Sequence, residues 1–272
     1  MLDRFDCYEL CVQSPRHITA FLRAAHGNEP GVLREDFCGT AAVSRRWVTE
    51  GRRSGDSGVR ATAADLDGAT LAAGRRLAGA EGVEGAVRFV QDDCIRPRAV
   101  DREAADVLFV GNFSIGYIHR RADLLGYLRR ARGVLSQARG GFGGGVLACD
   151  TYGGAGAFRL GGTQRRHPGR HGEVIHYTWV HESADPVTGM VENSIGFRVE
   201  RDGEIVQDLP RAFVYRWRLW SIAELREAML EAGFAAVEVY KDVNVAPGQS
   251  QVAVADPSEL GEDWIVMLVA RT

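Results

Sequence analysis

The stretch Leu33-Arg34-Glu35-Asp36-Phe37-Cys38-Gly39-Thr40-Ala41 carries the main fold signal of the chain. An apolar segment from Val32 to Phe37 runs through Cys38-Gly39-Thr40 into a helix that is predicted to continue through Trp47. A strand followed at once by a turn and a helix is the building unit of a parallel α/β sheet. We therefore expect this turn to lie at the carboxyl end of a central strand.

The same strand–helix alternation continues on both sides of this stretch. The apolar run at 106–110 is typical of a strand buried on both faces, as in a parallel sheet. Ser221 and Glu224 form a predicted capping box at the start of a late helix. The expected strands are 32–37, 59–64, 87–90, 106–110, 146–150, 236–240 and 264–270, and the expected helices include 5–25, 120–135 and 221–232.

The alternation of predicted strands and helices is interrupted between residues 152 and 219. Residues 153–170, rich in Gly, Arg and His, are expected to form a loop, and 173–181, 190–200 and 205–219 to form three antiparallel strands. This predicts a small antiparallel β lid inserted into the sheet. The expected division is N-terminal helices at 1–28, an α/β core at 29–151 and 220–272, and the lid at 152–219.

Composition excludes several classes of protein. The chain has 272 residues, 45% of them hydrophobic and 25% charged, with a net charge of −3, which excludes disorder, collagen and coiled coils and argues against a nucleic-acid or membrane-surface binder. The five cysteines are scattered, with no Cys-x-x-Cys pair, so neither a disulfide framework nor a zinc site is expected. Without an apolar secretory or membrane-spanning segment, we expect a cytoplasmic protein.

Polar residues follow four of the predicted strands, where ligands of open α/β sheets bind. They are the turn at 35–41, Asp65, Asp93, and the segment Asn112–Tyr117. Asp65 lies 26 residues after Gly39, and it is placed like the carboxylate that holds a ribose in nucleotide-binding sheets. An aspartate at a strand end is also a common helix cap, and that role stays open for Asp67, which would leave Asp65 free.

These segments together resemble the class I S-adenosylmethionine-dependent methyltransferases. The resemblance implies a Rossmann-like α/β fold, with a seven-stranded, mostly parallel sheet whose last strand is antiparallel, and S-adenosylmethionine as cofactor. Phe37 and Ala41 replace two glycines of the usual first motif, and the fourth motif is not the Asn/Asp-Pro-Pro-Tyr/Phe form of enzymes that methylate base or glutamine amino groups. The implied cofactor residues are Glu35, Cys38, Gly39, Thr40, Asp65, Leu66, Asp93, Cys94 and Asn112.

The inserted sheet resembles the lid of small-molecule N-methyltransferases, whose N-terminal helices close over the cofactor. Methyl transfer from a sulfonium requires alignment of the acceptor and exclusion of water, while a general base is optional. Trp179, with Phe213, Tyr215 and Trp217, also fits a packed lid core. No metal is expected; the candidate catalytic residues are Asn112, Tyr117 and His119, and the candidate substrate residues are Tyr8, Tyr177, Trp179, His181 and Arg216.

The sequence thus predicts N-methylation of an amine or imidazole nitrogen of a small, amino-acid-like metabolite. An O-methyltransferase of a small natural product and an RNA or protein methyltransferase are the enzyme alternatives. A non-catalytic cofactor-binding regulator and an NAD-dependent dehydrogenase are alternatives of another class, the latter opposed by the missing Gly-x-Gly-x-x-Gly. We expect no nucleic-acid or membrane partner, and a homodimer stays open.

Overall fold

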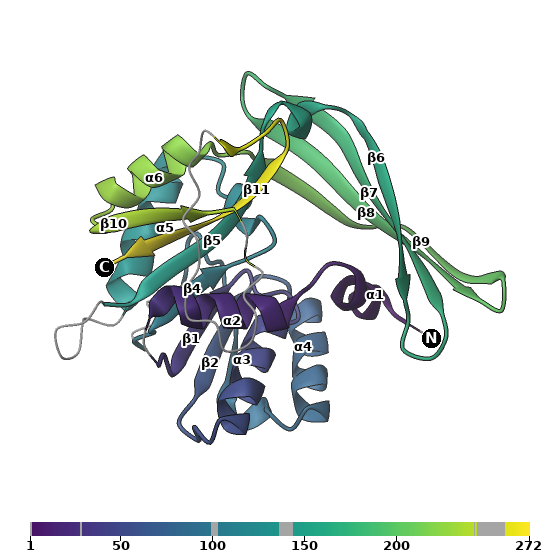
Figure 1. The fold of residues 1–272 in the computed structure, drawn as a ribbon, viewed down its shortest axis with the longest axis horizontal. Coiled ribbons are helices and arrows are strands. Elements are labelled where there is room, and N and C mark those ends of the chain that lie inside the picture. Colours follow the sequence, from purple (N-terminus) through teal and green to yellow (C-terminus); the bar gives the residue numbers. More distant parts are fainter. Residues whose placement is uncertain (1, 28, 99–102, 136–143, 242, 244–258) are drawn as a thin grey trace.

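A seven-stranded sheet forms the centre of the computed structural model, which describes residues 2–27, 29–98, 103–135, 144–241, 243 and 259–272 (Figure 1). Its strand order is β10-β11-β5-β4-β1-β2-β3, and only β11 pairs antiparallel with its neighbours. The predicted class I topology is therefore confirmed. The strands are β1 (Val32–Asp36), β2 (Arg60–Asp65), β3 (Val87–Gln91), β4 (Val107–Val110), β5 (Val146–Gly153), β10 (Ala236–Tyr240) and β11 (Trp264–Arg271).

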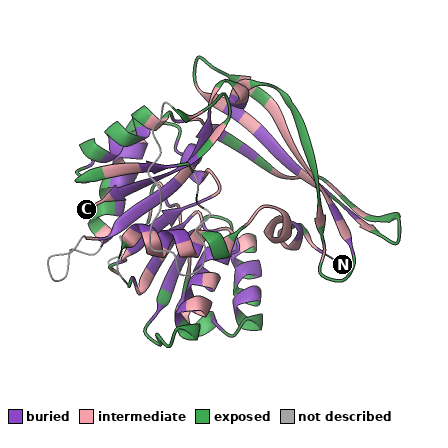
Figure 2. Ribbon diagram, viewed as in Figure 1, coloured by how far each residue is buried: buried purple, intermediate pink, exposed green. Residues whose placement is uncertain are grey.

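Helices cover both faces of this sheet, so the strands are buried (Figure 2). One core lies under α2 (Pro15–His26), α3 (Ala42–Arg53) and α4 (Gly68–Ala80). The other lies under α5 (Arg121–Val134) and α6 (Ile222–Glu231). The predicted capping box is present, because the Ser221 side chain accepts from the Glu224 N–H and Glu224 accepts from the Ser221 N–H. Short helical turns are η1 (Glu84–Ala86), η2 (Ser114–Tyr117) and η3 (Ala155–Phe158).

A four-stranded antiparallel lid extends from the core between β5 and α6 (Figure 1). Its strands, in spatial order, are β6 (Gly161–Pro168), β7 (Val174–Asp185), β8 (Met190–Arg201) and β9 (Glu204–Arg218). The prediction of a loop over 153–170 is wrong, because residues 161–168 form an edge strand paired with β7. Most of β6 is exposed, so its composition shows no apolar alternation, and backbone hydrogen bonds alone define the strand.

The inner layer of the lid is aromatic. Tyr215 stacks on Trp217 with ring centroids 4.5 Å apart, and Trp179 stacks on both at 6.2 and 6.0 Å. Tyr215 and Trp217 are buried, as the lid-core alternative predicted for them. Tyr152, at the end of β5, joins this layer and accepts a hydrogen bond from Asn193 at 2.9 Å. The aromatic layer therefore connects the lid to the sheet.

Helix α1 (Arg4–Cys11) lies between the free end of the lid and α4 (Figure 1). Asp3 caps it, and Asp6 completes a capping box. The Glu9 carboxylate accepts hydrogen bonds from the Thr40 hydroxyl and from the buried Arg45 guanidinium. These contacts fix α1 over the turn that follows β1.

Within the described residues, none of the helices is both long and apolar enough to cross a membrane. The Gly-rich segment 140–145, whose composition predicts a turn before the strand at 146–150, falls mostly outside the described residues.

Helix α4 packs directly against the turn after β1 at Gly74. A Cβ atom added to Gly74 would lie 2.8 Å from the Thr40 carbonyl oxygen and 2.9 Å from the Phe89 ring. Only glycine permits this approach, since backbone cannot move aside as a flexible side chain can. Gly79, on the same helix, has open space where its Cβ would lie.

We predict that Gly74→Ala lowers the free energy of unfolding by about 1–3 kcal/mol, because overpacking displaces the Thr40 carbonyl. Gly79→Ala is the matched control and should be neutral or stabilising by up to about 1 kcal/mol, because alanine favours a helix. Urea denaturation measures both. Equal effects of the two substitutions would contradict the close approach.

Candidate active site

A cavity of about 630 Å³ opens at the carboxyl ends of β1, β2, β3 and β4. Helix α1 and strand β9 of the lid form its other walls, through Phe5, Tyr8, Phe213 and Tyr215. The turn after β1 contributes Cys38, Gly39 and Thr40, and the ends of the next strands contribute Asp65, Leu66, Asp93, Cys94 and Asn112. Eight of the nine predicted cofactor residues therefore line one cavity.

The ninth, Glu35, lies below the cavity and does not line it. Its buried carboxylate accepts hydrogen bonds from the Ser44 N–H at 2.8 Å and the Ser44 hydroxyl at 2.5 Å. Burial raises its pKa to about 7. Glu35 thus connects the end of β1 to the first turn of α3.

The turn after β1 has left-handed backbone at Phe37 (φ 56°) and Ala41 (φ 59°). These are the two positions where the sequence departs from the glycines of the family motif. A left-handed conformation costs energy in a residue that has a Cβ atom. The turn therefore has the left-handed backbone that glycine favours, although neither residue is a glycine. Buried contacts hold this backbone, since Cys38 and Ala41 are almost fully buried.

Asp65 connects two turns at the edge of the cavity. Its Oδ2 accepts from the Gly39 N–H at 2.8 Å and its Oδ1 from the Asp67 N–H at 2.9 Å. Desolvation is the largest influence on its pKa, which is raised. Asp67 caps α4 through the Ala69 N–H, so the capping alternative holds for Asp67 and leaves the Asp65 side chain to the cavity.

The opposite wall offers an apolar surface and a carboxylate. Leu66 is 65% exposed, an unusual state for a leucine, and its side chain faces this cavity. Asp93 accepts from the Ile95 N–H at 2.8 Å, which fixes its carboxylate at the end of β3, next to Cys94. A flat, apolar ring with a polar edge fits between these groups.

The segment after β4 carries two consecutive left-handed residues, Asn112 (φ 55°) and Phe113 (φ 61°). The carboxylate of Asp150, within β5, accepts from the Asn112 N–H at 3.0 Å and the Phe113 N–H at 2.7 Å. Burial raises the pKa of Asp150 to about 7. Asp150 therefore holds the turn in a conformation that non-glycine residues seldom adopt.

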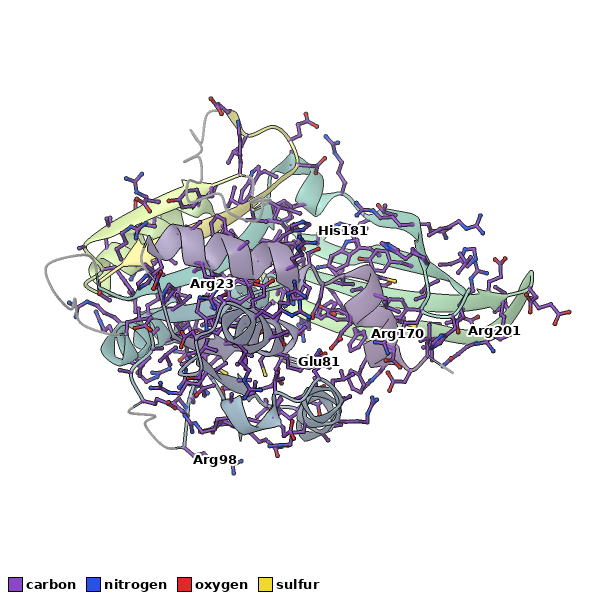
Figure 3. All side chains as sticks on the ribbon, turned by 60° about the horizontal axis from the view of Figure 1, so that its bottom comes forward. Arg23, Glu81, Arg98, Arg170, His181 and Arg201 are labelled. Carbon is purple, nitrogen blue, oxygen red and sulfur yellow. The ribbon has the colours of Figure 1, made fainter. Side chains whose placement is uncertain are left out.

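A second cavity, of about 840 Å³, lies under the lid. Tyr177, Trp179 and His181 of β7 line it, and so do Phe113 and Tyr152 from the core. Figure 3 shows His181 beside the helical layer, where the lid meets the core, and Arg201 at the distant end of the same sheet. Because Asn112 lines the first cavity and Phe113 the second, this turn forms part of the wall between them.

The predicted catalytic and substrate residues are divided among three places. Asn112, Tyr117 and Tyr8 line the first cavity, whereas Tyr177, Trp179 and His181 line the second. His119 is exposed, and its Nε2 lies 2.9 Å from the Arg216 carbonyl oxygen. Neither His119 nor Arg216 lines either cavity, so the structure does not bring them to the site.

Sequence reasoning missed Asp150, Phe5 and Tyr215. Asp150 follows a predicted strand, so the strand-end argument that found Asp65 applies to it equally. Phe5 and Tyr215 reach the site through the position of α1 and the curvature of the lid, which no local pattern encodes.

The hydroxyls of Tyr8 and Tyr117 in the first cavity stay protonated near neutral pH and can donate hydrogen bonds. Desolvation raises the pKa of Tyr117 to about 12 and that of Tyr8 further, although a hydrogen bond with Tyr215 opposes the shift for Tyr8. No cluster of metal-ligating side chains occurs among the residues that the structure describes.

We predict that Asp150→Ala lowers the free energy of unfolding by about 2–5 kcal/mol, because two buried N–H groups lose their acceptor. Asp150→Asn should cost less, since its carbonyl still accepts one of the two. Urea titration at pH 7 compares the three proteins. A loss below about 1 kcal/mol in Asp150→Ala would contradict the role of Asp150 in holding the turn.

The raised pKa of Glu35 gives a pH-dependent prediction. The folded protein binds this proton more tightly than the unfolded chain, so the stabilisation is present below about pH 4.5 and is lost as the pH rises through 7. The unfolding free energy of the wild type, relative to Glu35→Gln, should fall by up to about 3 kcal/mol over that window. Parallel pH profiles of the two proteins would contradict the shift.

Several solved structures with this arrangement are methyltransferases. The CcbJ methyltransferase of Streptomyces caelestis superposes with a TM-score of 0.64 at 19% identity, over 96% of both chains. DesVI of Streptomyces venezuelae superposes with a TM-score of 0.68 at 17% identity, over 99% of this chain and 98% of that one. The sugar N-methyltransferase KedS8 of Streptoalloteichus sp ATCC 53650 gives 0.65 at 17% identity, over 100% and 94%.

No protein-family model and no curated protein sequence matches the chain. The structural likeness extends over the lid as well as the core, because nearly the whole of each chain is covered. The chain has the fold of the class I S-adenosylmethionine-dependent methyltransferases with an inserted lid.

Proposed function

We propose that this protein is an S-adenosylmethionine-dependent methyltransferase that acts on a nitrogen of a small molecule. The observation that carries this proposal is the first cavity, where residues from four strand ends that are distant in sequence meet at the positions expected for an adenosyl ligand. The likeness in fold to small-molecule methyltransferases, one of them named a sugar N-methyltransferase, supports the same conclusion.

The residues of the first cavity fit the cofactor. Asp65 has carboxylate oxygens at the cavity edge for ribose hydroxyls, and the exposed Leu66 offers an apolar surface for adenine. Asp93 lies where it would accept a hydrogen bond from an exocyclic amine. The end of the cavity at Gly39, beside Thr40 and Asn112, would hold the amino-acid part of the cofactor.

When bound, the sulfonium supplies an activated methyl group. The chain's own contribution is to align the acceptor and exclude water. Helix α1 covers the cavity and is held there by the hydrogen bonds of Glu9 to Thr40 and Arg45. The hydroxyls of Tyr8 and Tyr117 stay protonated, so they can donate hydrogen bonds to polar groups other than the attacking lone pair.

A nitrogen acceptor suits this site better than an oxygen acceptor. An amine attacks through its own lone pair, whereas a hydroxyl needs a base to remove its proton. No histidine is present among the described residues that line the first cavity, where the methyl group of the cofactor would lie, and His181 lines only the second. Its carboxylates Asp65, Asp67 and Asp93 already accept backbone N–H groups. An O-methyltransferase therefore remains the second choice.

We further infer a cytoplasmic enzyme with a small-molecule substrate and no nucleic-acid or membrane partner. All five cysteines are free, as is usual in a reducing compartment, and the overall charge is close to neutral. A sedimentation experiment tests whether two copies of the protein associate.

We predict that S-adenosylhomocysteine binds the wild type and that NAD does not. Asp65→Ala should weaken binding by about 1–3 kcal/mol, the contribution of hydrogen bonds to a charged group. Asp56→Ala is the matched control, because Asp56 lies just before β2 at the opposite end of the strand, and its affinity should equal that of the wild type.

Isothermal titration calorimetry measures these affinities. Binding of NAD alone would contradict the methyltransferase proposal. Cofactor binding with no methyl transfer to any component of a metabolite extract would indicate a regulator instead.

A further inference from the structure

The second cavity has a chemistry that differs from that of the first. Its walls are largely aromatic, with Phe113, Tyr152, Trp179 and Trp264 around it. Its volume of about 840 Å³ is in the range of sites for drug-sized ligands and exceeds the needs of a free amino acid. It is therefore suited to an extended molecule with a flat or apolar body.

Four charged side chains line this cavity, and two of them form ion pairs with other carboxylates. Arg159 pairs with Glu262 at 2.6 Å, and Lys241 pairs with Glu259. Asp263 is the one carboxylate among the described lining residues. The fourth, Arg165 of β6, forms no ion pair with any described carboxylate, so its charge is not compensated within the described part of the protein.

The lid places Arg165 on the aromatic face. Arg165 is the direct cross-strand partner of Tyr177, as Thr163 is of Trp179 and Gly161 of His181, so these residues share one face of the sheet. Arg165 lies about 7 Å along the strands from the Trp179 pair. The next residue, Arg166, points to the opposite face, where it lies 3.9 Å from Glu200.

The second cavity also has a buried polar atom without a hydrogen-bond partner among the described residues. His181 Nδ1 is buried, with no hydrogen-bond partner among the described residues. Burial lowers the pKa of His181, so the imidazole is neutral near pH 7 and has a lone pair or an N–H for a ligand. Tyr152, whose ring centroid is 6.4 Å from that of His181, is 4.8 Å from Phe113 in the wall shared with the first cavity.

We propose that the second cavity is the acceptor site and that it takes an amine bearing an anionic group, a carboxylate or a phosphate, which pairs with Arg165. The amine lies at the Phe113 end, beside the turn that also lines the first cavity. His181 faces the polar part of the acceptor, and the aromatic walls hold its body. This assignment rests on the proposed function and names its substrate class.

The test uses labelled S-adenosylmethionine and a small-molecule extract with the wild type, Arg165→Ala, Arg165→Lys and Arg166→Ala. We expect the labelled product to be retained on an anion exchanger at about pH 11, where an amine is mostly neutral and the carboxylate or phosphate carries the net charge. Arg165→Ala should need at least about 10-fold more extract for half of the maximal rate, since it loses a charge-assisted contact. Arg165→Lys should restore part of this loss, and Arg166→Ala should match the wild type.

Affinity for S-adenosylhomocysteine should stay unchanged in all three variants, which also verifies that they fold. Phosphatase treatment of the extract separates the two anion sources: loss of the substrate identifies a phosphate, and its survival a carboxylate. A product that the exchanger does not retain, or equal behaviour of Arg165→Ala and Arg166→Ala, would overturn this assignment while leaving the proposed function intact. No labelled product with the wild type would contradict the proposed function and this assignment together.

Discussion

The carboxylate of Asp65 is the contact on which the arrangement of the site depends. It joins the turn after β1 to the turn after β2 through two backbone N–H groups. Both turns follow parallel strands, whose carboxyl ends meet at one edge of the sheet. The Cys38 N–H also donates to the Ala64 carbonyl of β2 at 3.0 Å, so the Asp65 carboxylate and this backbone hydrogen bond together fix the short, glycine-poor turn at 37–41 relative to β2. The first cavity is the space that these connected turns leave under α1 and the lid.

A second buried carboxylate organises the neighbouring region. Asp150 stabilises the left-handed pair Asn112-Phe113, so one turn presents successive side chains to two cavities. In-line displacement places the acceptor atom and the sulfur on opposite sides of the methyl carbon, in direct contact with it, so this mechanism requires the two cavities to open to each other beside this turn. The aromatic layer of the lid lies at this junction, through Tyr152 and Trp179.

The local sequence pattern was sufficient to predict the core and the candidate cofactor residues, because the alternation of strands and helices indicates which residues lie at strand ends. Asp65, Asp93 and Asn112 were found in this way. The same argument failed for β6, whose exposed residues carry no alternating signal. His119 was placed near the site by its distance along the chain from Asn112, but the turn η2 directs it outward, to the Arg216 carbonyl. Contacts made by α1 and the lid depend on tertiary packing, which sequence spacing does not record.

The most direct measurement is a crystal structure of the protein with S-adenosylhomocysteine. The account predicts ribose hydroxyls within hydrogen-bond distance of the Asp65 carboxylate, adenine against Leu66 with its amine near Asp93, and the sulfur directed toward the Asn112-Phe113 turn. A ligand bound elsewhere, or a ribose that faces away from Asp65, would contradict it.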